Sequence, residues 1–150
     1  MKVTLIIASL ILPIAVLILF SLSIIVPSYA SISMSITNGK IIYPAIVSFN
    51  LKVNSHSYFG CFYYFYVIKF IYNGKTYTPN PIDNYYAFDG KPNSFSVAFY
   101  MPSKLYAQIE HEKSVTLTIV IKTVIITSLN TTIDKIYNVQ GLFQIENNSI

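Results

Sequence analysis

Residues 115–122 read VTLTIVIK, and this stretch shows the pattern that decides the fold. Val115, Leu117, Ile119 and Ile121 occupy alternate positions, with threonine, valine and lysine between them. Such alternation, rich in β-branched residues, is typical of a strand with one buried face. The same pattern recurs in four other stretches, at residues 31–37, 47–53, 94–99 and 137–145.

One stretch departs from simple alternation. Residues 62–71 read FYYFYVIKFI and are apolar or aromatic on both faces, apart from Lys69. A strand covered on both sides has this composition. The following Asn73-Gly74 is flanked by Tyr72 and by Lys75-Thr76-Tyr77, and it predicts a type I′ hairpin turn.

Other breaks in the pattern predict local features. Asn38-Gly39 predicts a turn after the first strand, and Pro44 predicts that residues 41–46 form an edge strand. Gly141 predicts a bulge in the last strand. Residues 103–113 fit either a short helix capped by Ser103 or a further strand, so this segment stays open.

These stretches together predict an all-β fold. About seven strands within residues 31–150 match the size of an immunoglobulin-like β-sandwich. The chain has one cysteine and no tryptophan, which excludes the Cys–Trp–Cys core of antibody domains and any disulfide within the chain. We therefore expect an immunoglobulin-like β-sandwich of about seven strands, preceded by one N-terminal transmembrane or signal helix.

Residues 3–26 form an uncharged apolar run at the N-terminus. A helix of this length extends about 36 Å, enough to cross a hydrocarbon core about 30 Å thick. Lys2 precedes the run, and no charged residue follows it until Lys40. The positive-inside rule then predicts a cytoplasmic N-terminus, with residues 31–150 extracytoplasmic at the cell membrane.

The same run is also compatible with a signal peptide. Ser28 and Ala30 are small residues at the −3 and −1 positions of a cleavage site after Ala30. The run is longer than the usual apolar region of a signal peptide, which favours a retained anchor. Either way, the chain divides into an N-terminal helical segment (residues 1–30) and an exported β-sandwich (residues 31–150).

Composition narrows the function classes. Hydrophobic residues make up 53% of the 150 residues and charged residues only 11%, and all ten basic residues are lysines. The lysines are spread along the chain rather than clustered, and arginine, the usual bidentate reader of guanine and phosphate, is absent. We therefore expect no nucleic-acid partner.

The sequence contains no recognisable catalytic set. It has two histidines, no GxSxG motif and no glycine-rich phosphate loop. The one dense polar cluster is Glu110-His111-Glu112, whose neighbouring side chains point in different directions in a helix or a strand and so suit a solvated turn better than a metal site. We expect no enzyme activity, no catalytic residue, no metal site and no cofactor.

Aromatic and modifiable residues give the candidate contact sites. Residues 79–93 form the longest stretch without strand character, and tyrosines gather near it. These side chains either present an interaction surface or pack across strands, and the candidate surface is Tyr77, Tyr85, Tyr86 and Phe88. Asn130 and Asn147 lie in sequons for N-glycosylation, at a frequency that chance alone explains.

Three functions follow from these features. The first is a single-pass, membrane-anchored, non-enzymatic cell-surface module that uses residues 3–26 in the bilayer and meets other envelope or surface proteins, or itself. The second is a secreted structural subunit that is cleaved after Ala30 and assembles by adding the strand 31–37 to a neighbour's sheet. The third is a small-ligand or glycan-binding module that uses the loop 79–93.

Overall fold

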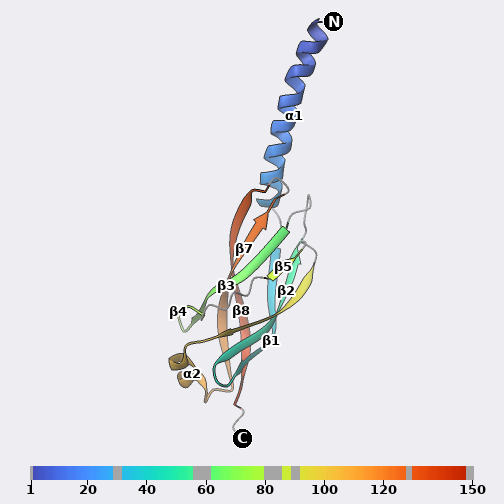
Figure 1. Ribbon diagram of the computed structural model, residues 1–150. Helices are drawn as coiled ribbons and strands as arrows, with labels where there is room; N and C mark the ends of the chain where they lie inside the picture. The colour runs from blue at the N-terminus through green and yellow to red at the C-terminus, as the bar shows by residue number, and fades with distance from the viewer. Residues whose placement is uncertain are drawn as a thin grey trace.

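The computed structural model describes residues 2–28, 32–55, 62–79, 86–88, 92–127 and 130–147. It begins with helix α1 (Lys2–Ser28), which extends away from a β-rich body (Figure 1). We call the described residues from 32 to 147 the β-domain. The C-terminus lies at the end of the β-domain opposite α1.

The β-domain contains eight strands and a short helix. The strands are β1 (Ile32–Ile42), β2 (Ile46–Ser55), β3 (Phe62–Tyr72), β4 (Lys75–Tyr77), β5 (Tyr86–Phe88), β6 (Asn93–Tyr100), β7 (Ser114–Ile126) and β8 (Thr132–Glu146). Helix α2 (Ser103–Ile109) connects β6 to β7. The predicted all-β class with an apolar N-terminal helix is confirmed, and the described residues hold eight strands where about seven were expected.

Hydrogen bonds join all eight strands into one sheet. Its order is β4-β3-β7-β8-β1-β2-β6, and β5 pairs with the same edge of β3 as β4 does. Neighbouring strands are antiparallel except β1 and β8, which pair in parallel from Gly39–Phe143 to Ile42–Glu146. The first and last strands of the β-domain are therefore neighbours, and both start at the end of the domain next to α1.

The sheet curls so that its two ends meet across an aromatic core. Phe70 of β3 packs against Phe99 of β6 with ring centroids 5.4 Å apart, and Phe65 of β3 meets Phe95 of β6 at 5.0 Å. Phe49 of β2 adds an edge contact to Phe143 of β8 at 5.8 Å. Burial of large aromatic rings is a major source of stability in a domain of this size.

Several local expectations meet a definite outcome. Asn73 and Gly74 have φ values of 47° and 75°, as a type I′ turn between β3 and β4 requires. Asn38 and Gly39 do not form a turn: they lie inside β1, where the register with β2 shifts and Asn38 has φ 53°. The Asn-Gly pair is used here for a bulge, because a bulge also needs a residue that tolerates positive φ.

Two further expectations are corrected. Pro44 lies in the turn between β1 and β2 and not in an edge strand, and it follows a cis peptide bond. Gly141 shows no register shift against β7. Its role is close packing, because an added Cβ would lie 2.8 Å from a methyl carbon of Ile36. From the sequence alone, a single glycine in a strand is compatible with either a bulge or a close contact with a neighbouring side chain.

The sequence left helix and strand open for residues 103–113, and residues 103–109 form a helix. Its N-cap is Pro102 and not Ser103, and it makes no side-chain capping hydrogen bond. Leu105, Tyr106 and Ile109 are buried, so the helix covers the end of the core opposite α1. Tertiary packing of this face, rather than capping, holds so short a helix in place.

Candidate functional site

Helix α1 is the first candidate functional element. It carries a 20-residue span, Val3–Leu22, that is long and apolar enough to cross a membrane, by length and composition. None of that span is buried against the rest of the protein. Its large side chains are 41% (Leu22) to 70% (Val3) exposed. A helix that is apolar all round and uncovered suits an apolar solvent such as lipid.

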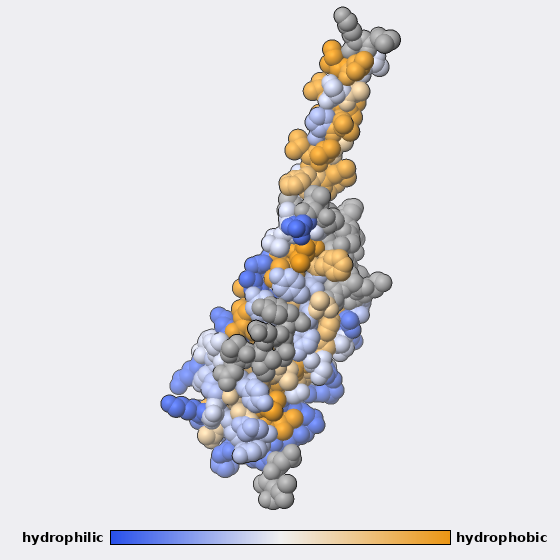
Figure 2. Space-filling view, viewed as in Figure 1, coloured by the Kyte–Doolittle hydropathy of each residue, from blue (hydrophilic) through white to orange (hydrophobic). Residues whose placement is uncertain are grey.

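The polar residues of α1 are compatible with that solvent. Ser9 donates a hydrogen bond from Oγ to the carbonyl oxygen of Ile6 at 2.8 Å, so its hydroxyl is satisfied within the helix. Pro13 lies inside the helix, as transmembrane helices tolerate. Apolar residues predominate on the visible side of α1 in Figure 2, with a few more polar residues between them, whereas hydrophilic residues predominate at the end of the β-domain opposite α1, which we call the far end.

The end of the β-domain next to α1 is the second candidate element, and we call it the near end. Strand pairing brings together Ile32 with Ser55, and Phe62 with Ile126 and Thr132. Phe62 opens β3 and is 66% exposed. Residues 62–71 were predicted to be covered on both sides, so this exposed ring was missed. Nothing in the composition of this stretch indicates which end of the strand lies uncovered.

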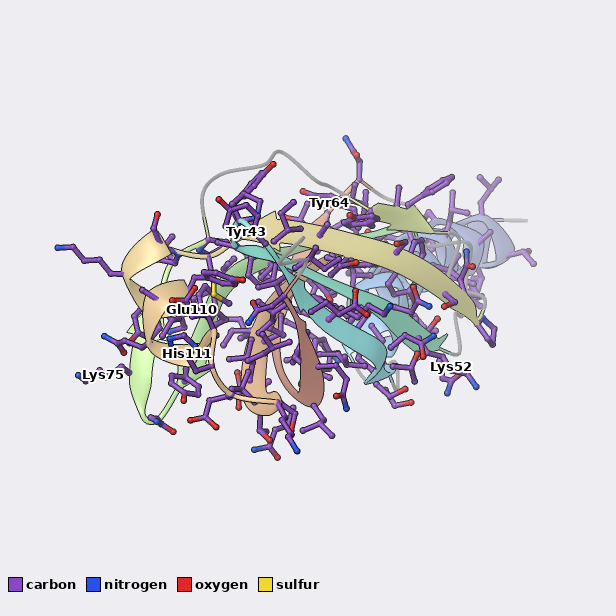
Figure 3. All side chains as sticks on the ribbon, turned by 90° about the horizontal axis from the view of Figure 1, so that it is seen from below. Tyr43, Lys52, Tyr64, Lys75, Glu110 and His111 are labelled. Carbon is purple, nitrogen blue, oxygen red and sulfur yellow. The ribbon has the colours of Figure 1, made fainter. Side chains whose placement is uncertain are left out.

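A band of aromatic and aliphatic residues continues from the near end over the outer face of β3, β7 and β8. The next rows pair Tyr64 with Val124 and Tyr66 with Lys122. Val124 is 5% exposed although it points away from the core side of β7. Tyr64 projects from the β-domain in Figure 3 (Figure 3).

One ion pair interrupts this band. Lys122 Nζ lies 2.9 Å from Asp134 Oδ2, and this hydrogen bond is the main cause that raises the pKa of Lys122, with a smaller contribution from Tyr66. The two charges are paired with each other within the band. The same outer face also carries the exposed Lys69 opposite Val120, and the exposed polar residues Thr132, Asn138 and Gln140 of β8.

The predicted interaction surface divides into separate packing sites. Tyr77 stacks on Phe70 at 5.4 Å, and Tyr86 stacks on Phe65 at 5.1 Å. Burial raises the pKa of Tyr86 and outweighs a hydrogen bond from the backbone of Ala98, which lowers it. Both rings thus contribute to the core as well as to the surface.

The side chains of the other two residues of that surface, Tyr85 and Phe88, are not among those that the structure describes. Tyr85 lies outside the described residues, and of Phe88 only the backbone is described, paired with Tyr63. Strand β4 pairs with the last residues of β3 and β5 with its first. The structure therefore does not bring Tyr77 and Tyr86 into one continuous site.

The two sequons lie in different settings. Asn130 is exposed in the β7–β8 turn with φ 61°, beside a hydrogen bond of 2.6 Å between the hydroxyls of Thr127 and Thr131. Asn147 follows β8 and joins it to α2: its Oδ1 accepts from the hydroxyl of Tyr106 at 3.0 Å, and its Nδ2 donates to the carbonyl of Glu110 at 2.6 Å. Ala30, the candidate cleavage point, lies outside the described residues.

The acidic cluster after α2 is open to solvent. His111 Nε2 lies 3.7 Å from Glu110 Oε1, and the His111 side chain is 88% exposed. The described residues contain no group of three histidine, cysteine, aspartate or glutamate side chains that could hold a metal ion. Lys52 and Lys75 lie on opposite sides of the view in Figure 3, so these two lysines do not share a patch.

Comparisons with known proteins give a distant structural likeness and no match in sequence. The sequence matches no protein-family model and no curated protein. A solved structure that it resembles is that of the periplasmic chaperone SfaE, with 10% identity and a TM-score of 0.39 over 80% of this chain. The match spans 59% of the chaperone chain, and a likeness this distant carries no argument about function.

Proposed function

We propose that the protein is a single-pass, membrane-anchored surface module with a structural or interaction role and no enzymatic activity. The observation that carries this proposal is the complete separation of two apolar surfaces. The β-domain closes its own core with residues from β1 to β8, and the Val3–Leu22 span of α1 contributes nothing to that core. An uncovered apolar helix of this length is stable in a bilayer and costly in water.

The proposed orientation follows from the flanking charges. Lys2 lies before the helix and no charged residue follows it before Lys40, which favours a cytoplasmic N-terminus and an extracytoplasmic β-domain. Added protease would then digest the β-domain on intact cells. Protection of that domain until the cells are lysed would contradict the orientation while leaving the anchor intact.

The secreted subunit is the alternative to a retained anchor. It needs the strand 31–37 to be available to a neighbour. The described residues Ile32–Thr37 instead pair with β2 in the same chain, and Ile32 and Met34 pack partly buried against the core. This intramolecular pairing favours the anchored module. Partners are other envelope or surface proteins, or a second copy of the chain.

Membrane extraction and N-terminal mass spectrometry test the proposal together. We expect the native protein to stay in the membrane fraction after high salt and carbonate, with its chain starting at Met1 or Lys2. Release by carbonate would contradict the anchor. A chain that starts at Ser31 would instead support the secreted subunit.

A further inference from the structure

We propose that the near end of the β-domain is itself a lipid-contacting surface that rests in the headgroup layer of the bilayer, with Phe62 as its apolar contact. This inference rests on the proposed membrane anchor. It adds a second, separate contact between the protein and the membrane. The partner is the surface of the same bilayer that holds α1.

The length of chain between α1 and β1 limits how far the near end can be from the membrane. Helix α1 ends at Ser28 and β1 begins at Ile32, so four Cα–Cα steps join them. Fully extended, they reach about 14 Å. The headgroup layer is about 5–8 Å thick on each side of the hydrocarbon core. The start of β1 therefore lies within about 14 Å of the end of α1.

The strand register fixes which residues face the membrane at that distance. Strands β1 and β8 are parallel, so both begin at the near end, and β7 ends there because it is antiparallel to β8. Phe62 pairs with Ile126, the last residue of β7. The start of β3, which carries the exposed Phe62, thus lies at the end of the domain next to α1 (Figure 1).

The first two rows of residues at the near end carry no charge among the described residues. They contain serine, threonine, asparagine, isoleucine and aromatic side chains: Ile32, Ser33, Asn54, Ser55, Phe62, Tyr63, Ile125, Ile126, Thr132 and Ile133. The exposed Lys52 lies two rows further along β2, opposite Ser35 and Ser94. The nearest acid, Asp134, is paired with Lys122. Partial dehydration in the headgroup layer therefore costs little.

The far end has the opposite character. It carries the Lys40–Glu146 ion pair at 2.7 Å, the Lys75 side chain of the β3–β4 hairpin and the exposed Glu110-His111 pair. Tyrosine and tryptophan are enriched at the level of the headgroups in membrane proteins, and Tyr64 follows the exposed Phe62 on the outer face of β3. The two ends of the β-domain thus suit lipid and water, respectively.

The absence of tryptophan from the chain permits a direct test. Three single-tryptophan variants of the full chain are reconstituted in phosphatidylcholine–phosphatidylglycerol vesicles that contain lipids brominated on their acyl chains. Phe20→Trp reports on the anchor, Phe62→Trp on the proposed contact, and Tyr100→Trp on the far end, where Tyr100 closes β6 and is 43% exposed. Near-equal unfolding temperatures establish that the variants fold.

We expect the bromines to quench Phe20→Trp most strongly and Phe62→Trp clearly, with a blue-shifted emission. Tyr100→Trp should show neither effect. If Phe20→Trp is quenched while Phe62→Trp behaves like Tyr100→Trp, the lipid contact is wrong and the anchor stands. A blue shift of Phe62→Trp without quenching would indicate a protein contact and also overturn the inference. Loss of quenching at Phe20→Trp would overturn the anchor, and the contact with it.

Discussion

A missing side chain at Gly141 lets β1 and β8 lie against each other. An alanine there would place its Cβ 2.8 Å from Ile36 Cγ2 and 3.1 Å from a ring carbon of Phe143. Because the backbone conformation of Gly141 is not of the positive-φ kind, the cost of Gly141→Ala is steric. We expect it to lower the free energy of unfolding by about 1–3 kcal/mol, as overpacking does.

Chemical denaturation of the detergent-solubilised protein measures this effect, and the partner residue supplies the control. The double variant Gly141→Ala/Ile36→Ala removes the methyl group that the new Cβ meets. Its destabilisation should be smaller than the sum of the two single variants. Additive effects would show that the Ile36 contact is not the cause.

Two partly buried tyrosines, Tyr86 and Tyr137, make the β-domain sensitive to alkali. Burial raises the pKa of both Tyr86 and Tyr137 above the value of 10.0, and the charge of Tyr63 adds to the shift at Tyr137. A raised pKa in the folded state means that the stabilisation is fully present below about pH 10 and is lost as the pH rises beyond it.

Denaturation between pH 8 and pH 11 tests this dependence with the variant Tyr86→Phe/Tyr137→Phe. Whatever the variant's stability at pH 8, its unfolding free energy should fall less steeply than that of the wild type above about pH 10. Parallel curves for the two proteins would contradict the assignment to these hydroxyls.

At the scale of the elements, α2 is held in place by hydrogen bonds to Asn147, a residue far away in the sequence. The Tyr106 hydroxyl donates to Asn147 Oδ1, and Asn147 Nδ2 donates to the carbonyl of Glu110 at the end of the helix. The ring of Tyr106 also meets Tyr43 edge-on at 6.4 Å. Asn147 therefore ties the end of β8 to α2 and satisfies a carbonyl at the helix terminus.

The variant Tyr106→Phe removes the hydroxyl and keeps the ring. We expect a loss of about 0.5–1.5 kcal/mol in unfolding free energy and faster hydrogen exchange of the α2 amides. Tyr100→Phe, which removes an exposed hydroxyl on β6, is the matched control and should leave exchange in α2 unchanged. Equal exchange in both variants would show that the Asn147 contact does not hold the helix.

Secondary-structure elements could be predicted where the residues that form the sequence pattern also cause the local structure. The Asn73-Gly74 turn follows from the two positive φ values that this pair tolerates, and the alternation of 115–122 follows from one buried face of β7. The Asn38-Gly39 pair was misread because turns and bulges need the same backbone conformation. In β3 a register shift between Val67 and Lys69 changes the buried positions from odd-numbered (Tyr63 and Phe65) to even-numbered (Phe70). The local sequence does not predict this shift.

At the scale of the whole molecule, the separation of α1 from the core predicts that the stability of the β-domain does not depend on α1. The Val3–Leu22 span makes no buried contact with the β-domain. Removal of residues 1–28 should therefore leave the unfolding temperature of the β-domain in detergent unchanged and abolish its retention in the membrane fraction. A clear fall in that temperature would show that the helix stabilises the domain.

The candidate site was harder to predict than the fold class. An uncharged run of this length identifies α1 by itself, because length and composition decide whether a helix can cross a bilayer. The near end exists because β1 pairs in parallel with β8, about a hundred residues later in the chain. Pairing over such a separation depends on the whole core, so the exposure of Phe62 beside α1 could not be read from residues 62–71.

The parallel pairing of β1 with β8 also has a mechanical consequence. One strand is tied to α1 through three residues, and the other leads to the C-terminus at the opposite end of the β-domain. A pull between the membrane and anything attached to the C-terminus would load the Gly39–Ile42 and Phe143–Glu146 segments in shear. Hydrogen bonds loaded in shear must break together and not one after another, so this short ladder would act as the mechanical clamp of the domain.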